Sequence, residues 1–201
     1  MIRVLLADDE RLFRDAMSDV LNMVEGIEVV GRAADGEEAL SLIREVRPDV
    51  AVIDLQMPKL DGIGVVAALA EEGLAVATLI VTSHALPGVL DAAMDVGATG
   101  LVPKDTSTVE LIDIIRKAAS GLRHVDPYLA VESKMIGPNP LSPREVELLR
   151  LAAKGGSVES IAKEAKISWA TARNHFSNCR SKLGASSRHE AVFIAKSRGW
   201  I

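Results

Sequence analysis

Apolar and polar residues alternate in blocks along the first 120 positions of the chain, and the blocks are of two kinds. Short, nearly continuous aliphatic runs, typical of strands buried on both faces of a sheet, occupy residues 2–7, 27–33, 49–54, 76–83 and 99–104. Longer stretches with helical spacing of apolar residues lie near 11–24, 36–46, 61–72, 87–96 and 106–120. Strand-then-helix units of this length favour parallel strands with right-handed crossovers. The pattern predicts a doubly wound α/β domain with a five-stranded parallel sheet.

The pattern changes after residue 121. Residues 122–140 lose periodicity, and "GPNP" at 137–140 cannot continue a helix. Beyond them the apolar spacing is helical throughout, and four serines mark helix starts, namely Ser142, Ser157, Ser168 and Ser187. We therefore predict an α/β domain at 1–120, a linker at 121–140 and a small all-α domain of four helices at 141–201.

Charge is distributed unevenly between these two parts. Residues 1–120 contain 10 Lys and Arg against 21 Asp and Glu, whereas residues 121–201 contain 13 against 7. The basic half favours a polyanionic partner such as nucleic acid. Chance surface composition is the alternative explanation, and charge alone does not decide between the two.

Other features of the composition limit the class of protein. The single cysteine, Cys179, excludes an internal disulfide and a cage of thiolate metal ligands. The apolar runs are too short to cross a bilayer. The N-terminal segment "MIRVLLADDE" has the pattern of a charged strand rather than a signal peptide. We expect a cytoplasmic protein with no membrane partner.

Residues with reactive or charged side chains gather at the ends of the predicted strands. Ligand sites in open parallel sheets form beyond the carboxyl ends of the strands, and the residues found there are Asp8, Asp9, Asp54, Thr82 and Lys104. Each has an ordinary alternative when taken singly, such as a helix cap, a strand residue or a surface charge. Their convergence on one edge of the sheet favours a shared site.

The chemistry of this set is coherent. Three carboxylates close together repel one another, so they favour a hard divalent cation, most simply Mg²⁺. With the metal bound, Asp54 stays ionised and can accept a phosphoryl group as an aspartyl phosphate. Lys104 would then hold one phosphoryl oxygen as a point charge, and the Thr82 hydroxyl would bond another.

The motifs "LLADDE", "VIDLQMPKLDG", "VTSHA" and "GLVPKD" resemble the receiver domain of two-component response regulators, which has a flavodoxin-like (CheY-like) fold. The resemblance implies that Asp54 is the phosphoacceptor, that Asp9 binds Mg²⁺ directly and Asp8 through water, and that the Gln56 carbonyl is a third metal contact. Receivers usually carry Tyr or Phe three residues before the lysine, whereas this chain has Leu101. A swinging aromatic ring is therefore not available here.

The segment "SWATARNHFSNCRSKLG" at 168–184 carries a second signal. At helical spacing, one stripe of this segment is apolar and consists of Ala172, Phe176, Cys179 and Leu183. The opposite side is polar and contains Arg173, Asn174, Ser177 and Ser181. With the preceding helix and turn at 155–168, this is the arrangement of a helix-turn-helix with a recognition helix. A solvated helix face with no partner is the alternative.

The region 138–201 resembles the LuxR-type DNA-binding domain in "LSPREVELLRLAAKG", "SIAKEAKIS" and "TARNHFSNCRSKLGASSRHEAV". The whole chain is thus similar to a response regulator of the NarL/FixJ type. The resemblance implies base contacts from Arg173, Asn174 and Ser177, and phosphate contacts from Lys163, Thr171 and Lys182. His175 fits either helix packing or a DNA contact, and Trp169 either packs locally or approaches the DNA backbone.

The sequence therefore predicts a transcriptional regulator controlled by phosphorylation. A sensor histidine kinase would phosphorylate Asp54, which would promote a homodimer and the binding of double-stranded DNA, with RNA polymerase as a further candidate partner. One alternative is a DNA-binding regulator that ignores phosphate. An aspartyl phosphatase is another, although Gln56 replaces the general acid that such enzymes commonly need two residues after the nucleophile. A pure protein-interaction module would leave the polar side of 168–184 without a role.

Overall fold

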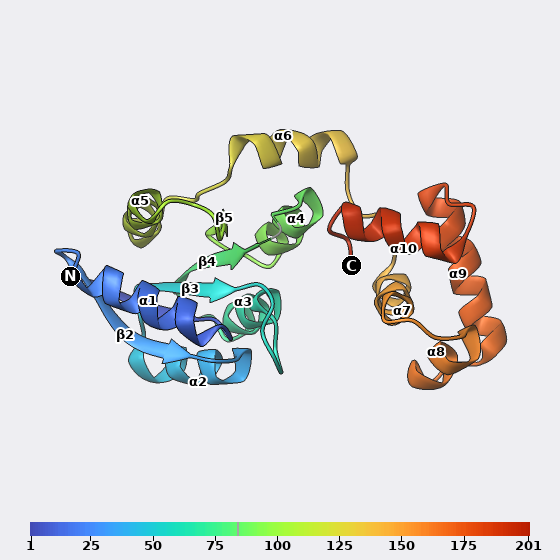
Figure 1. The fold of residues 1–201 in the computed structure, drawn as a ribbon, viewed down its shortest axis with the longest axis horizontal. Helices are drawn as coiled ribbons and strands as arrows, with labels where there is room; N and C mark the ends of the chain where they lie inside the picture. The colour runs from blue at the N-terminus through green and yellow to red at the C-terminus, as the bar shows by residue number, and fades with distance from the viewer. Residues whose placement is uncertain (84) are drawn as a thin grey trace. The chain divides into compact units, whose positions relative to one another are not determined.

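The computed structural model describes residues 1–83 and 85–201, which divide into two compact units. The first unit comprises Met1–Ala85 and Leu90–Val131, and the second comprises Leu86–Val89 and Glu132–Ile201. The first is built on a parallel sheet in the order β2-β1-β3-β4-β5 (Figure 1). Its strands are β1 (Ile2–Ala7), β2 (Ile27–Ala33), β3 (Val50–Asp54), β4 (Ala77–Thr82) and β5 (Gly100–Pro103). The five-stranded parallel sheet predicted from the apolar runs is confirmed.

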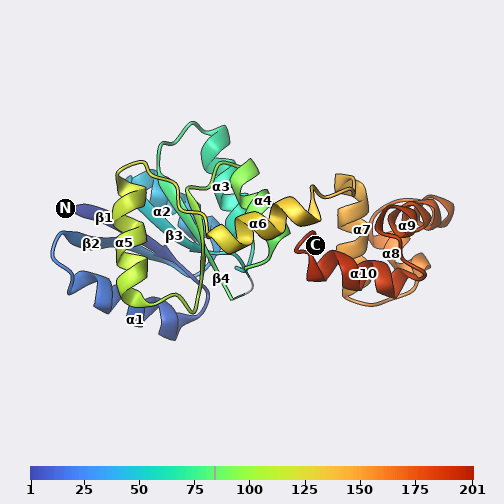
Figure 2. The same ribbon diagram turned by 90° about the horizontal axis from the view of Figure 1, so that it is seen from above.

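Helices cover both faces of this sheet. Their bounds are α1 (Arg11–Asn22), α2 (Gly36–Val46), α3 (Gly62–Glu71), α4 (Pro87–Asp95) and α5 (Thr108–Ala119). Helices α1 and α5 lie on one side of the sheet, and α2 and α3 lie on the other (Figure 2). On the α1 and α5 side, alternate strand residues such as Val4, Val52 and Val81 pack in one cluster with Leu21 and Ile115. Burial of both faces accounts for the continuous apolar runs in the sequence.

A glycine brings α3 close to the end of β3. A Cβ atom added at Gly62 would lie 2.5 Å from the main-chain oxygen of Asp54, so a larger residue would push the helix away. The Asp61 side chain caps the same helix by accepting a hydrogen bond from Gly64 N at 2.7 Å. The "DG" pair after the third strand therefore holds the loop that follows Asp54.

Helix α6 (Pro127–Ile136) lies within the segment predicted to be a linker and was not predicted from the sequence. The Asp126 carboxylate caps its first turn by accepting hydrogen bonds from the main-chain N–H groups of Tyr128 and Leu129. Leu129 is buried and Ile136, the last residue of the helix, is half-buried against the core of the second unit, but Tyr128, Val131 and Met135 are exposed. Because the helix has no buried stripe, its apolar spacing gave no clear sign of it.

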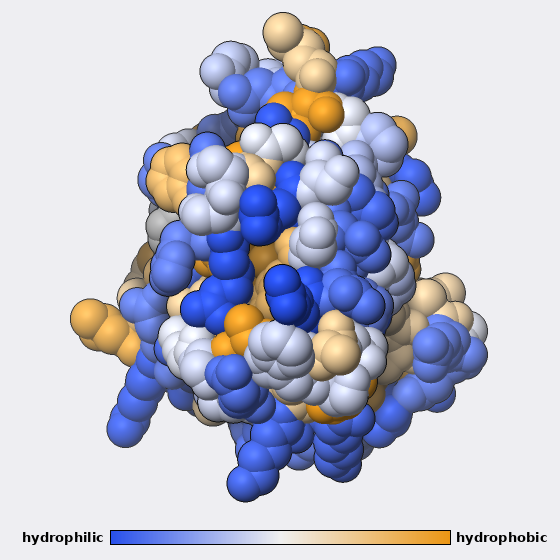
Figure 3. All heavy atoms as spheres, turned by 90° about the vertical axis from the view of Figure 1, so that its right-hand side faces the viewer, coloured by the Kyte–Doolittle hydropathy of each residue, from blue (hydrophilic) through white to orange (hydrophobic). Residues whose placement is uncertain are grey.

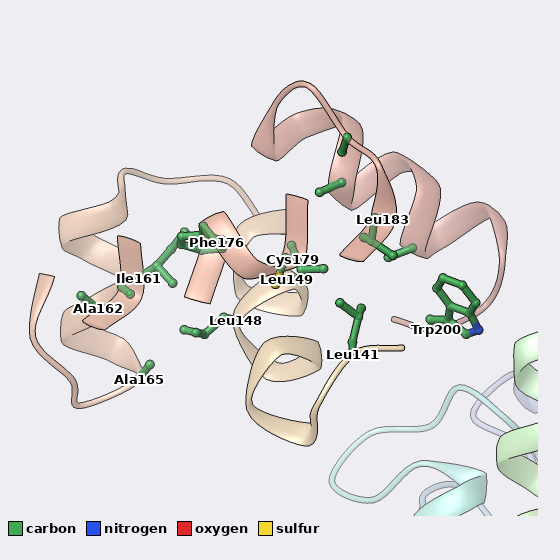
Figure 4. Close-up of a cluster of buried hydrophobic side chains, with 14 residues drawn as sticks. Leu141, Leu148, Leu149, Ile161, Ala162, Ala165, Phe176, Cys179, Leu183 and Trp200 are labelled. Carbon is green, nitrogen blue, oxygen red and sulfur yellow. The ribbon is translucent and has the colours of Figure 1, made fainter. Parts of the chain in front are cut away.

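The second unit contains the four predicted helices, α7 (Pro143–Ala153), α8 (Val158–Glu164), α9 (Trp169–Leu183) and α10 (Arg188–Ser197). Each of the four serines named above accepts a hydrogen bond from the main-chain N–H three residues on, as a helix cap does. Leu148 and Leu149 from α7, Ile161 from α8, and Phe176 and Cys179 from α9 meet in one apolar core (Figure 4).

None of the described helices is long and apolar enough to cross a membrane.

Candidate functional site

Four neighbouring strands bring the predicted acidic site together at their carboxyl ends. Asp8 directly follows β1, Asp54 and Thr82 end β3 and β4, and Lys104 directly follows β5. The main-chain N–H of Lys104 donates to the carbonyl oxygen of Thr82 at 2.8 Å, which ties the last two positions to each other. An open depression of about 270 Å³ lies at this edge, lined by Asp9, Glu10, Asp54, Gln56, Thr82, Ser83 and Lys104.

The three carboxylates among the four predicted metal contacts lie close together, and the fourth residue, Gln56, lines the same depression. Asp8, Asp9 and Asp54 each offer a carboxylate oxygen, and these oxygens lie within 4.8 Å of one another. Asp8 and Asp54 are buried, whereas Asp9 is exposed. Burial raises the pKa of the Asp54 carboxyl, and the nearby charge of Asp8 raises it further, against the opposing effect of Lys104. The site therefore makes a negative charge on Asp54 unfavourable unless more positive charge is supplied, and an all-oxygen donor set suits a hard divalent cation.

Lys104 is the cation of the site. Its Nζ lies 2.9 Å from Asp8 Oδ2 and 3.2 Å from Asp54 Oδ2. Burial alone would lower the pKa of this ammonium, but the surrounding carboxylates outweigh burial and raise the pKa above its ordinary value. Lys104 is therefore a permanent positive charge, placed between two of the three acids.

Three contacts of the site were not predicted from the sequence. Glu10 Oε1 also lies 3.0 Å from Lys104 Nζ, the Phe13 ring centroid is 4.9 Å from the same atom, and the Arg14 guanidinium donates to the main-chain oxygen of Asp8. The run "DDE" contains Glu10, so the sequence held a signal for it. Phe13 and Arg14 lie on the amphipathic helix α1, where no motif distinguishes them from other residues.

Leu101, at the position where receivers usually carry an aromatic residue, is fully buried in β5. It is paired in register with Ile80 of β4. Its side chain is part of the aliphatic core and offers no ring at the edge of the depression.

Helices α8 and α9 form the predicted helix-turn-helix. The residues predicted to be buried in α9, Ala172, Phe176, Cys179 and Leu183, are all buried. The six predicted DNA contacts are all exposed, namely Lys163, Thr171, Arg173, Asn174, Ser177 and Lys182. The face of the unit seen over these helices is mostly hydrophilic, with only scattered apolar groups (Figure 3). Burial raises the pKa of the Cys179 thiol to about 11, as expected of an inert core residue.

Lys182 has a partner that the sequence did not reveal. Its Nζ lies 2.7 Å from Oε2 of Glu145, and the Glu145 carboxylate is buried at the start of α7. The same oxygen accepts a hydrogen bond from the main-chain N–H of Ser142 at 2.7 Å. Burial acts to raise the pKa of Glu145, but Lys182 and Ser142 outweigh it and lower the pKa. The pair joins the end of α9 to the start of α7.

A Lys182→Met variant should therefore be less stable than the parent protein in a pH-dependent manner. Because the folded-state pKa of Glu145 is lowered, the pair stabilises the fold above the ordinary pKa of a glutamate, and the contribution is lost as pH falls through the folded-state pKa. We expect a loss of about 1 kcal/mol at pH 7, since the ammonium is partly exposed and screened. Urea denaturation between acidic and neutral pH measures it, with exposed Lys196→Met as the control. An equal loss at every pH would contradict the ion pair as the cause.

Two known protein families match the parts of the chain that contain the acidic site and the helix-turn-helix. The first part of the chain matches the response regulator receiver domain over residues 4–116, and the last part matches the luxR family of bacterial regulatory proteins over residues 139–195. The protein therefore belongs to the luxR-type response regulators. It is a two-component response regulator that binds DNA to regulate transcription, and it is not a classical enzyme. This confirms the family inferred from the sequence motifs.

Individual relatives cover the whole chain. The transcriptional regulatory protein YvfU of Bacillus subtilis (strain 168), itself named as uncharacterized, is 39% identical over 201 residues, which is 100% of both chains. DesR of the same organism is 34% identical, again over 100% of both. Among solved structures, RcsB of Salmonella enterica serovar Typhimurium, bound to promoter rprA with the phosphomimetic BeF3⁻, is similar with a TM-score of 0.69. It is 25% identical and covers 98% of each chain.

Proposed function

We propose that Asp54 accepts a phosphoryl group from a sensor histidine kinase and that this modification controls DNA binding by α9. The observation that carries the proposal is the position of Lys104, whose ammonium bridges Asp8 and Asp54 beside the open depression. An ion pair that served stability alone would not need an open space lined by further acids and a hydroxyl. Thr82 and Ser83 line that space together with the acids.

The transfer step uses residues already in place. An Asp54 oxygen attacks phosphorus, the P–N bond of the phosphohistidine breaks, and the imidazole leaves with the electron pair and takes up a proton. Lys104 exchanges its contact with Asp54 for a phosphoryl oxygen, and the Thr82 hydroxyl bonds another. In the proposal Mg²⁺ is held by Asp8, Asp9, Asp54 and the Gln56 carbonyl, and it supplies positive charge that offsets the charge of the phosphoryl oxygens.

The output follows from the two-part organisation. We propose a receiver domain at residues 1–120, a linker at 121–140 and a DNA-binding domain at 141–201. Phosphorylation favours a homodimer, so that two α9 helices bind paired half-sites in adjacent major grooves of double-stranded DNA. A structure of two RcsB dimers bound to two parallel DNAs supports a dimer as the form that binds DNA. The proposal places the protein in the cytoplasm with its DNA, where RNA polymerase is a candidate partner.

The proposal is tested by supplying a phosphodonor to the full chain. After incubation with acetyl phosphate and Mg²⁺, intact-mass analysis should show one added phosphoryl group, and genomic fragments should be captured more strongly than by untreated protein. Excess EDTA should suppress both effects, because the three carboxylates then lack their cation. A protein that gains no phosphoryl mass, or that gains it without any change in DNA capture, would refute the proposal.

A further inference from the structure

Trp169, the first residue of α9, is a large apolar side chain that the fold leaves partly in solvent. It is 46% exposed and lies outside the buried core of the unit. Tryptophan and arginine are both enriched among the residues that contribute most of the binding energy at protein interfaces. The residue lies at the end of the recognition helix from which base contacts are usually made.

The indole ring has a specific neighbour. The guanidinium carbon of Arg173, one helical turn further along α9, lies over the ring at 5.4 Å from its centroid. Spacing of four residues places both side chains on the same face of the helix, and tryptophan is the most favourable ring for a cation–π contact. Arg173 is thus restricted in its rotamers before any DNA is bound.

The Trp169 side chain also has a neighbour on α8. The pKa of the Glu159 carboxyl on α8 is lowered mainly by its own main-chain N–H and the Ser157 hydroxyl, with a smaller contribution from the Trp169 side chain. At the first turn of α9, the Ser168 hydroxyl accepts from Thr171 N at 3.1 Å and pairs with the Thr171 hydroxyl at 2.8 Å. These hydrogen bonds fix the first turn of α9, on which Trp169 lies.

Arg173 keeps its hydrogen-bond donors for another partner. Across residues 1–83 and 85–201, no carboxylate is recorded in an ion pair with it, whereas Lys182 at the other end of α9 is paired with Glu145. None of its N–H groups is used in a hydrogen bond among the described residues, and a guanidinium that lies over an aromatic ring can keep the N–H groups at its edge available. Two of these groups match O6 and N7 of guanine in the major groove.

We propose that Trp169 positions the Arg173 guanidinium for recognition of a guanine, and that Trp169 is thereby a specificity-determining residue of the DNA-binding domain. The inference rests on the proposed function of α9. Because the ring already restricts the rotamers of Arg173, the side chain loses less conformational entropy when it binds DNA. This smaller loss raises the affinity only for a sequence that presents a matching base edge to the guanidinium. A ring that contacted the sugar-phosphate backbone would instead strengthen binding to every sequence alike.

The experiment measures dissociation constants for a selected target duplex and for duplexes with one base pair replaced. Arg173→Ala first identifies the base pair at which Arg173 discriminates. At that base pair Trp169→Ala should lose about 2- to 5-fold of the discrimination, the range expected for a cation–π contact at an exposed site. Trp169→Phe should restore part of it, and combining Trp169→Ala with Arg173→Ala should lose no more than Arg173→Ala alone.

The control is Phe193→Ala, which removes another exposed aromatic side chain, 72% exposed on α10. It should leave the discrimination at this base pair unchanged, and thermal melting should show that all variants fold. Equal weakening on all duplexes by Trp169→Ala, or no change in discrimination, would overturn the positioning role of Trp169. If Arg173→Ala discriminates between the duplexes as well as the parent protein does, the proposal that Arg173 of α9 contacts a base is wrong. That result would refute the proposed function of α9, whereas the two results above would refute only the role of Trp169.

Discussion

Replacing Asp54 by asparagine should abolish phosphoryl uptake and, with it, the response of DNA binding to a phosphodonor. The amide has the size of the carboxylate but lacks the nucleophilic oxygen anion, so no acyl phosphate can form. The change removes only one of the carboxylates around Lys104, since Asp8 and Glu10 remain at 2.9 and 3.0 Å. Intact-mass analysis after acetyl phosphate and Mg²⁺ should therefore show no added group on the variant.

The expected absence of phosphoryl uptake by Asp54→Asn would not be due to a loss of folding. Burial and Asp8 raise the pKa of Asp54, which means that the folded state disfavours its charged form. Since the neutral amide removes that cost, the variant should melt no lower than the parent. Asp113→Asn, which changes an exposed acid of α5 paired with Lys117, should still accept one phosphoryl group. Uptake by the Asp54→Asn variant at the parent rate would show that another residue is the acceptor.

The acidic site was predictable because topology, rather than side-chain detail, brings it together. Once the apolar runs are taken as parallel strands, Asp54, Thr82 and Lys104 must end at one edge of the sheet. The sequence could not show that Lys104 also reaches Glu10, because the two residues are 94 positions apart and the contact depends on how long side chains bend. Motif spacing predicts the path of the backbone. It does not predict that the Lys104 ammonium pairs with Asp8, Glu10 and Asp54.

In the DNA-binding unit too, the sequence predicted the buried faces of helices but not the contacts between distant side chains. The buried stripe of α9 followed directly from helical spacing and is confirmed at each of its four positions. The partner of Lys182 is Glu145, 37 residues earlier, and the sequence presented Glu145 only as half of a capping box. Helix α6 was missed because a helix that buries one leucine leaves little trace in the hydrophobic pattern. Local periodicity therefore identified elements that pack, and it failed where side chains from distant elements meet or where an element stays exposed.

A Leu149→Ala variant should lose DNA binding and keep phosphoryl uptake, whereas Asp54→Asn loses phosphoryl uptake. Leu149 is fully buried in the core that joins α7 to α9 (Figure 4). Truncating a buried leucine costs about 2–5 kcal/mol because the lost apolar contact leaves a cavity. A domain of this size has a total stability on the order of 3–9 kcal/mol, at 0.05–0.15 kcal/mol per residue. The variant should therefore lose most of its DNA binding at 37 °C.

Phosphoryl uptake should survive the same change, because Asp54 belongs to a separate compact unit with its own core. Urea denaturation should show the transition of the DNA-binding unit moved to lower urea while that of the receiver stays in place. The matched control is Leu122→Ala, in which the leucine is 58% exposed and the expected change is within about 0.5 kcal/mol. If Leu149→Ala abolished phosphoryl uptake as well, the two units would not fold independently, and the assignment of acceptor and DNA-binding roles to separate domains would be wrong.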